Sequence, residues 1–315
     1  MRRTASRRRL ISCLSQRSAE GRNLSGRTRT RSLRSPKTLA SSLKAAGVES
    51  SNLICAIDFT ASNKTAGTET FGGRSLHTLD HKGGNPYEQA LSIIGQTLSS
   101  FDDDNLIPAF GFRDQTSKSF GTRMLGQAPC RGFEGVLSEY RRSLQRGVVL
   151  SGPTSFAPVI RKAVDLVKES GHQLHVLLII ADGQVSEALD CKRETINAIV
   201  EASRVPLSIV VVGVGDGPFD QMETFDDQLP ERRFDNLQFV DFGPFQTALA
   251  ANPSKEKRAA IEAAFALCAL QELPSQFKEI VRLGLLENGR LGDCGQPRRP
   301  CAIDDEPATQ RQRLI

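Results

Sequence analysis

The stretch LICAIDFTAS occupies residues 53–62 and begins the apolar patterning of the chain. Its first five residues, 53–57, form a short continuous apolar run, which is typical of a strand covered on both faces. Three later segments have a similar character: 106–112 (LIPAFGF), 176–180 (VLLII) and 207–212 (LSIVVV). Residues 237–242 (LQFVDF) are the candidate for a last strand. The sequence therefore predicts several short strands that are buried on both faces.

Amphipathic segments separate these strands and predict helices. They cover residues 86–101, 133–144, 156–170 and 193–203, and two more follow at 253–270 and 274–283. In the third segment, Ser155 is placed to cap the helix, Pro158 falls in its first turn and Gly171 marks its end. Strands that alternate with helices favour an α/β fold with a doubly wound, mostly parallel sheet flanked by helices.

Side chains that carry oxygen follow two of the predicted strands. Asp58, Thr60 and Ser62 come directly after the first strand, and Asp182 comes directly after a later one. Ligand sites in doubly wound sheets lie at the carboxyl ends of the strands, so we expect these side chains to converge. Thr154, in the run SGPTSF, offers a further hydroxyl. Because Mg²⁺ prefers oxygen ligands, these five residues predict a Mg²⁺ site, with Mn²⁺ and Ca²⁺ as alternatives.

The same residues also allow interpretations without a metal. An aspartate followed by Thr and Ser can cap a helix or brace a loop, and Asp182 before Gly183 can belong to a turn. A phosphatase-type nucleophile at Asp58 would need a second acid two residues later, where Thr60 stands. We therefore assign no catalytic residue and no organic cofactor.

The positive charge of the chain is concentrated at its beginning. Residues 1–44 hold eleven arginines and two lysines against one acid, a balance of +12, so the total of +5 leaves −7 for residues 45–315. This arm has too few apolar residues to fold alone and is expected to be disordered. It is also compatible with an organellar transit segment, or with attachment to an anionic membrane or to nucleic acid.

The cysteines and the hydropathy bear on the compartment. The seven cysteines are odd in number and include no close pair, which favours a reducing intracellular compartment, cytoplasm or nucleus, over a disulfide framework. The longest apolar runs are strand-sized, so we expect no transmembrane segment.

Several longer runs carry a resemblance to a known family. Beside the residues after the first strand, they are 85–112 (NPYEQALSIIGQTLSSFDDDNLIPAFGF), 152–160 (GPTSFAPVI), 175–185 (HVLLIIADGQV), 206–219 (PLSIVVVGVGDGPF), 234–242 (FDNLQFVDF) and 273–277 (LPSQF). In these runs the chain resembles the copine family, whose shared domain is a variant of the von Willebrand factor A fold. It is most similar to the plant branch of RING-type ubiquitin ligases built on a copine domain.

The resemblance implies a domain over residues 49–286, followed by a disordered tail at 287–315. It also implies a metal-ion-dependent adhesion site at Asp58, Thr60, Ser62, Thr154 and Asp182. Such a site captures an aspartate or glutamate of a partner protein.

The resemblance leaves two functions open. The first is a metal-dependent protein-binding module. The alternative is a component of protein ubiquitination that works with the ubiquitination machinery. After residue 287 only Cys294 and Cys301 remain as candidate zinc ligands, so we expect no RING within this chain.

Overall fold

The computed structural model describes residues 51–79, 83–99, 102, 104–112, 122–183, 185–186, 189–227, 229 and 231–286. The proposed basic arm at 1–44 and the proposed tail at 287–315 lie outside the described residues. So do Cys13, Cys294 and Cys301.

A six-stranded sheet forms the centre of the fold, in the order β4-β3-β1-β6-β7-β8. Its strands are β1 (Asn52–Asp58), β3 (Ala109–Phe112), β4 (Thr122–Met124), β6 (His175–Ala181), β7 (Leu207–Gly213) and β8 (Leu237–Asp241). Every pairing is parallel except that of β3 with β4, which is antiparallel. The doubly wound, mostly parallel sheet expected from the sequence is confirmed.

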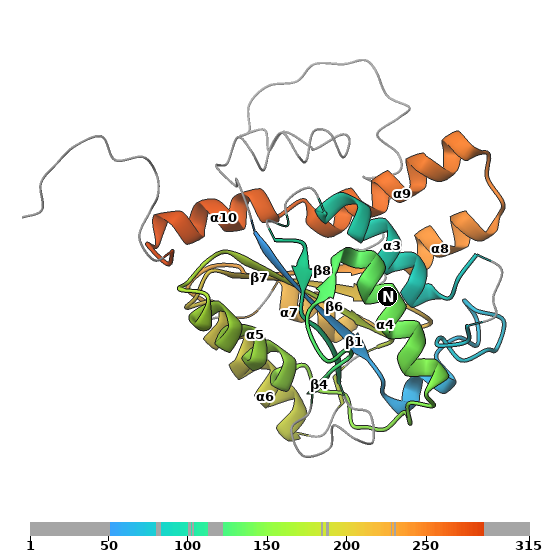
Figure 1. Cartoon of the computed structure of the whole chain (residues 1–315), viewed down its shortest axis with the longest axis horizontal. Helices are drawn as coiled ribbons and strands as arrows, with labels where there is room; N and C mark the ends of the chain where they lie inside the picture. Colours follow the sequence, from blue (N-terminus) through green and yellow to red (C-terminus); the bar gives the residue numbers. More distant parts are fainter. Residues whose placement is uncertain are drawn as a thin grey trace, which may run out of the picture.

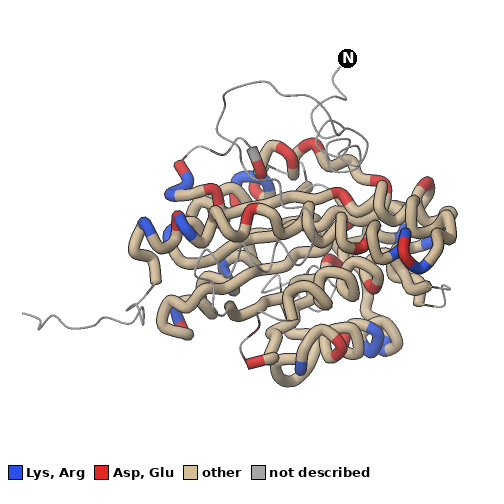
Figure 2. Tube along the Cα trace, turned by 90° about the horizontal axis from the view of Figure 1, so that it is seen from above, with Lys and Arg blue, Asp and Glu red and all other residues tan. Residues whose placement is uncertain are grey.

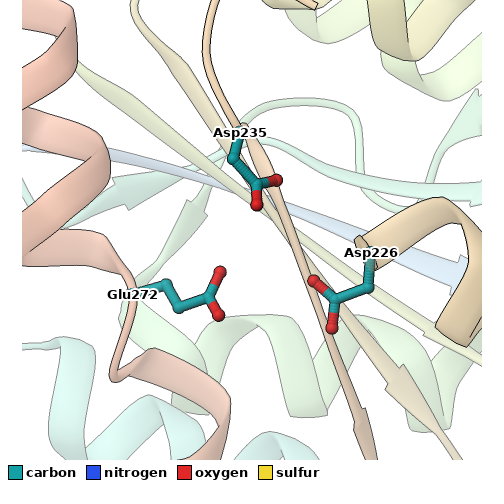
Figure 3. A group of neighbouring side chains, drawn as sticks. All are labelled: Asp226, Asp235 and Glu272. Atoms are coloured by element: carbon teal, nitrogen blue, oxygen red, sulfur yellow. The ribbon is translucent and has the colours of Figure 1, made fainter. Parts of the chain in front are cut away.

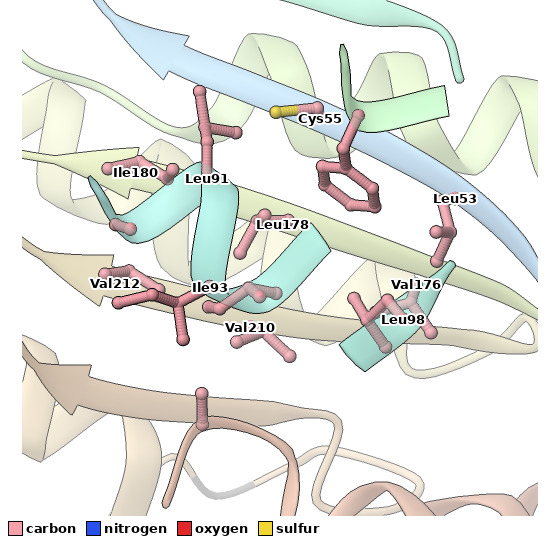
Figure 4. Close-up of a cluster of buried hydrophobic side chains, with 14 of the residues drawn as sticks. Leu53, Cys55, Leu91, Ile93, Leu98, Val176, Leu178, Ile180, Val210 and Val212 are labelled. Carbon is pink, nitrogen blue, oxygen red and sulfur yellow. The ribbon is translucent and has the colours of Figure 1, made fainter. Parts of the chain in front are cut away.

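Helices cover both faces of the sheet (Figure 1). One face carries α3 (Pro86–Leu98), α4 (Gly132–Gln145), α8 (Gly243–Ala250), α9 (Lys255–Leu270) and α10 (Leu273–Arg282). The other carries α5 (Ala157–Glu169), α6 (Leu189–Ala202) and α7 (Asp220–Asp227). Successive strand residues point to opposite faces, so the sheet separates two apolar cores. Figure 4 shows Leu91 and Ile93 of α3 lying over strand residues such as Leu178.

The start of α3 follows from its sequence. Asn85 accepts a hydrogen bond from the main-chain N–H of Glu88, and the Glu88 carboxylate accepts one from the N–H of Asn85. This reciprocal pair is a capping box, and Pro86 suits the first turn because its missing N–H needs no partner there. The helix therefore begins at a defined residue close to the end of β1.

The start of α5 differs from the expectation. Ser155 does not cap it: the N-cap is Phe156, and it makes no side-chain capping bond. The ring of Phe156 is buried in the core against Phe112, so tertiary packing fixes this helix end in place of a cap. Pro158 and Gly171 lie where the sequence predicted, in the first turn and just after the helix.

The predicted strand at 106–112 is divided. Pro108 separates β2 (Leu106–Ile107), which pairs antiparallel with β5 (Cys130–Arg131), from β3 in the main sheet. Proline has no N–H for a strand ladder, which explains the break. Two short helices, α7 and α8, were not predicted because eight residues give little periodicity to detect.

Charged residues of both signs are interspersed over the described part of the chain (Figure 2). Several of them pair on the surface, as Arg161 does with Glu194 at 2.6 Å. Exposed pairs of this kind contribute little to stability. Within the described residues, no helix has the length and apolar character needed to span a membrane.

Candidate metal centre

Two neighbouring strands bring the candidate carboxylates together. β1 pairs with β6 in parallel, with Ile57 opposite Ile180. Asp58 is the last residue of β1, and Asp182 follows the last residue of β6. Both side chains are therefore delivered to the carboxyl edge of the sheet, and they are buried there, with 0% and 2% of their surface exposed.

Hydrogen bonds join four of the five predicted residues. The main-chain N–H of Thr60 donates to Asp58 Oδ1 at 2.8 Å. The hydroxyls of Thr60 and Ser62 share a hydrogen bond of 2.8 Å, and Ser62 Oγ donates to Asp182 Oδ1 at 3.1 Å. A single turn of 3₁₀-helix, η1 (Ala61–Lys64), folds the chain back so that Ser62 reaches Asp182. Ser62 is exposed, so the site opens to solvent at this residue.

The segment that carries Thr154 contacts the loop after β1 through the main chain of Ser151. Ser151 bridges the site loop: its carbonyl accepts from Ala61 N at 2.6 Å and its N–H donates to Phe59 O at 3.1 Å. The main chain of Thr154 is held by Ser186, which accepts from Thr154 N and donates its own N–H to Thr154 O. Among the described residues, no hydrogen bond joins the Thr154 hydroxyl to the other four side chains. Thr154 is nevertheless buried, with 7% of its surface exposed.

The two carboxylates are electrostatically frustrated. Burial and repulsion from Asp182 raise the pKa of Asp58 well above its usual range. Burial also raises the pKa of Asp182, to about 6, against the lowering effect of the hydrogen bond from Ser62. Two like charges in a shared buried site disfavour double ionisation. Without an ion, this shared buried site therefore favours protonation of the pair over double ionisation.

These carboxylates fit a divalent cation. Asp58 Oδ2 and Asp182 Oδ2 are buried and have no hydrogen-bond partner among the described residues. Unpaired buried carboxylate oxygens are costly, and a cation between them would satisfy both oxygens and remove the repulsion. The neighbouring donors are hydroxyls, so the whole set consists of the oxygen ligands that suit Mg²⁺ or Mn²⁺.

A group of buried polar side chains lies beside the site, and most of its members were not predicted from sequence patterning. His77 Nε2 contacts the carbonyl oxygen of Asp58 at 2.9 Å, and its Nδ1 contacts Tyr140 Oη at 2.8 Å. Burial lowers the pKa of His77 to about 3, so the ring is neutral and one nitrogen donates while the other accepts. Asn63 and Tyr87 form a second branch, in which Tyr87 Oη donates to Asn63 Oδ1 at 2.7 Å. Only Asn63 could have been suspected from the sequence, because it directly follows Ser62.

Figure 3 shows a second acidic cluster, whose Asp235 lies shortly before the first residue of β8. Asp226, Asp235 and Glu272 bring carboxylate oxygens within 4.8 Å of one another. Arg232 pairs with Asp235 at 2.7 Å, and its guanidinium donates to the carbonyl oxygens of Phe225 and Asp226. Because this buried arginine already supplies a positive charge, we interpret the cluster as structural.

Comparison with known proteins places the chain in a family. The family model for copine matches residues 75–289, which include Thr154 and Asp182. The chain belongs to the copine family. The match starts after Ser62, so the residues that follow β1 lie outside it.

Several plant and animal proteins are similar in sequence. The E3 ubiquitin-protein ligase RGLG5 of Arabidopsis thaliana is 48% identical over 293 residues, which cover 89% of this chain and 64% of that protein. RGLG2 of the same plant is 48% identical over 254 residues, covering 78% of this chain and 53% of that protein. Copine family protein 2 of Caenorhabditis elegans is 44% identical over 261 residues, 81% of this chain and 3% of that protein. The chain thus spans about half to two thirds of the plant relatives.

Solved structures show more distant likenesses. The manganese-loaded TRAP protein of Plasmodium vivax has a TM-score of 0.42 at 15% identity, covering 64% of this chain and 72% of that one. A von Willebrand factor type A protein from Catenulispora acidiphila has a TM-score of 0.40 at 11% identity, covering 67% of this chain and 43% of that one.

Proposed function

We propose that this copine domain is a metal-dependent protein-binding module. In this proposal Asp58, Thr60, Ser62, Thr154 and Asp182 hold a divalent cation, Mg²⁺ in the first instance, with Mn²⁺ or Ca²⁺ as alternatives. The observation that carries the proposal is the pair of buried oxygens, Asp58 Oδ2 and Asp182 Oδ2, that lack hydrogen-bond partners among the described residues.

The partner class follows from ligand number and ligand type. The site offers two carboxylates, which balance a divalent cation, and at most three hydroxyls. Mg²⁺ takes six oxygen ligands in octahedral geometry, so at least one position falls to water or to an incoming oxygen. A carboxylate is the hard anionic ligand that competes best with water there. The partner therefore presents an aspartate or a glutamate at the exposed Ser62 side of the site.

Capture of a partner tests this function. Wild type and Asp58→Ala are used as baits with Mg²⁺ or with EDTA, and the captured protein is then purified. Of the four conditions, we expect capture only by wild type in Mg²⁺. Capture should also be lost when the aspartate or glutamate by which the partner contacts the site is changed to asparagine or glutamine. Capture that survives both EDTA and Asp58→Ala would contradict the proposal.

A second candidate function is a role in protein ubiquitination. It is favoured by the 48% identity over 293 residues to RGLG5, whose name is that of an E3 ubiquitin-protein ligase. We propose that the copine domain recognises a protein partner in such a reaction.

This candidate is tested with purified activating and conjugating enzymes. We expect no ubiquitin chains from residues 1–315 alone, and ubiquitination of the captured partner when a RING ligase is added. Chain formation by the purified protein alone would show that it carries its own transfer module.

A further inference from the structure

We propose that Tyr87 and Asn63 are positioning residues that fix the direction of the hydroxyl protons of Thr60 and Ser62, so that both oxygens present lone pairs to a cation. This inference rests on the proposed metal-binding function and deepens it. It concerns residues outside the five candidate ligands.

The directed series of hydrogen bonds begins at Tyr87. Tyr87 is fully buried, with 0% of its surface exposed, and its hydroxyl contacts Asn63 Oδ1 at 2.7 Å. Burial and the negative charges of Asp58 and Asp182 raise the pKa of Tyr87 well above its usual range, so it remains a phenol and a donor. An amide oxygen can only accept, so the contact orients the amide of Asn63.

The oriented amide then acts on Thr60. With its oxygen occupied by Tyr87, the Asn63 side chain presents its NH₂ group to Thr60 O at 3.2 Å and to Thr60 Oγ1 at 3.4 Å. Thr60 Oγ1 therefore accepts a hydrogen bond from Asn63, and its own hydroxyl proton points elsewhere.

Ser62 determines where the proton of Thr60 goes. The single hydroxyl proton of Ser62 is donated to Asp182 Oδ1, which as a carboxylate oxygen only accepts. We therefore assign Thr60 Oγ1 as the donor and Ser62 Oγ as the acceptor in the 2.8 Å contact between the two hydroxyls. All contacts from Tyr87 to Asp182 thus point in one direction.

The consequence is a defined electronic surface. The hydroxyls of Thr60 and Ser62 each donate one hydrogen bond and accept one. Each oxygen therefore keeps one lone pair that accepts no hydrogen bond. A hydroxyl that turned its proton toward the site would repel a cation. Removing a residue that orients a metal ligand through a hydrogen bond typically changes metal affinity about 10- to 100-fold.

A matched pair of variants tests the inference. Tyr87→Phe and Tyr140→Phe each remove one hydroxyl from a fully buried tyrosine, and the two rings lie 6.1 Å apart in the same aromatic cluster. Tyr140 accepts a hydrogen bond from Asn85 and contacts His77, which in turn contacts the main-chain carbonyl of Asp58 and no candidate ligand hydroxyl. The readouts are the dissociation constant for Mn²⁺ by calorimetry and the melting temperature of the metal-free protein.

We expect both variants to lower the melting temperature of the metal-free protein. We also expect Tyr87→Phe to weaken Mn²⁺ binding about tenfold, and Tyr140→Phe, whose branch contacts only the main chain of Asp58, to weaken it distinctly less. Asn63→Ala removes the amide itself and is expected to weaken binding at least as much as Tyr87→Phe. Equal dissociation constants for wild type and Tyr87→Phe, or equal losses in the two tyrosine variants, would overturn the inference.

Two further results separate this inference from the function on which it rests. If wild type does not bind Mn²⁺, the proposed metal site falls and the inference falls with it. In wild type, the side-chain amide protons of Asn63 should give two resolved, slowly exchanging NMR signals that shift on addition of Mg²⁺. Rapid exchange with solvent would overturn the fixed amide even if a variant did not fold.

Discussion

Ser62 donates a hydrogen bond of 3.1 Å to Asp182, across 120 positions of the chain. This contact closes the candidate site, because it joins the loop after β1 to the end of β6. The carboxylate that accepts it keeps its second oxygen buried and without a hydrogen-bond partner among the described residues. The hydroxyls of the site are therefore hydrogen-bonded, whereas its two buried carboxylates repel each other.

This repulsion predicts that removing one charge stabilises the metal-free protein. Asp182→Asn keeps the size of the side chain and an oxygen that can accept from Ser62. Because the pKa of Asp182 is raised from 3.8 to about 6, we expect the free energy of unfolding of the Asp182→Asn protein at neutral pH to exceed that of wild type by roughly 1–3 kcal/mol. Urea unfolding in EDTA measures this. The exposed Asp165 on α5 provides a control, for which Asp165→Asn should change stability by less than about 0.5 kcal/mol. A destabilised Asp182→Asn protein would contradict the electrostatic account.

The same pKa shift predicts how stability depends on pH. A folded-state pKa above the unfolded value means that the folded protein binds more protons, so stability falls as pH rises through that interval. Without metal, the preferential protonation of Asp182 in the folded protein contributes fully to the free energy of unfolding below about pH 4. This contribution is lost as the pH rises through about 6. With Mg²⁺ the trend should reverse, because the cation binds the deprotonated pair. Melts of wild type and Asp182→Asn over this range isolate the effect, and parallel curves would contradict it.

Two glycines in the described loops predict a contrast between strain and crowding. Gly72 and Gly215 both have positive φ, +62° and +86°. A Cβ at Gly72 would meet nothing within 4 Å, whereas one at Gly215 would lie 2.4 Å from the carbonyl oxygen of Ala66. We expect Gly72→Ala to cost about 1 kcal/mol and Gly215→Ala to cost at least about 2 kcal/mol more. Chemical denaturation of both variants measures the loss in free energy of unfolding. Equal losses would show that the segment around Ala66 moves away from Gly215 at little cost.

Much of the fold could be predicted from the sequence because its strands are buried on both faces. Segments such as 176–180 are continuous apolar runs, and their strand assignment depends on little else. The end of a helix was harder to predict when packing decides it. Phe156 begins α5 in place of Ser155 because its ring lies in the core against Phe112.

The candidate site divides in the same way. Asp58 and Asp182 could be predicted to converge, since parallel neighbouring strands end at one edge of the sheet. Tyr87, His77 and Tyr140 could not, because their contacts depend on how α3 and α4 pack over β1. A buried tyrosine looks the same in sequence whether its hydroxyl serves a site or only the core.

The most direct test of the metal site is calorimetric titration of the purified, metal-free protein with Mn²⁺. The account predicts one bound ion per chain for wild type, no binding for Asp58→Ala, and unchanged binding for Glu272→Gln, which alters the separate acidic cluster. No binding by wild type would contradict the account, and so would undiminished binding by Asp58→Ala. Loss of binding in Glu272→Gln would place the ion at the other cluster.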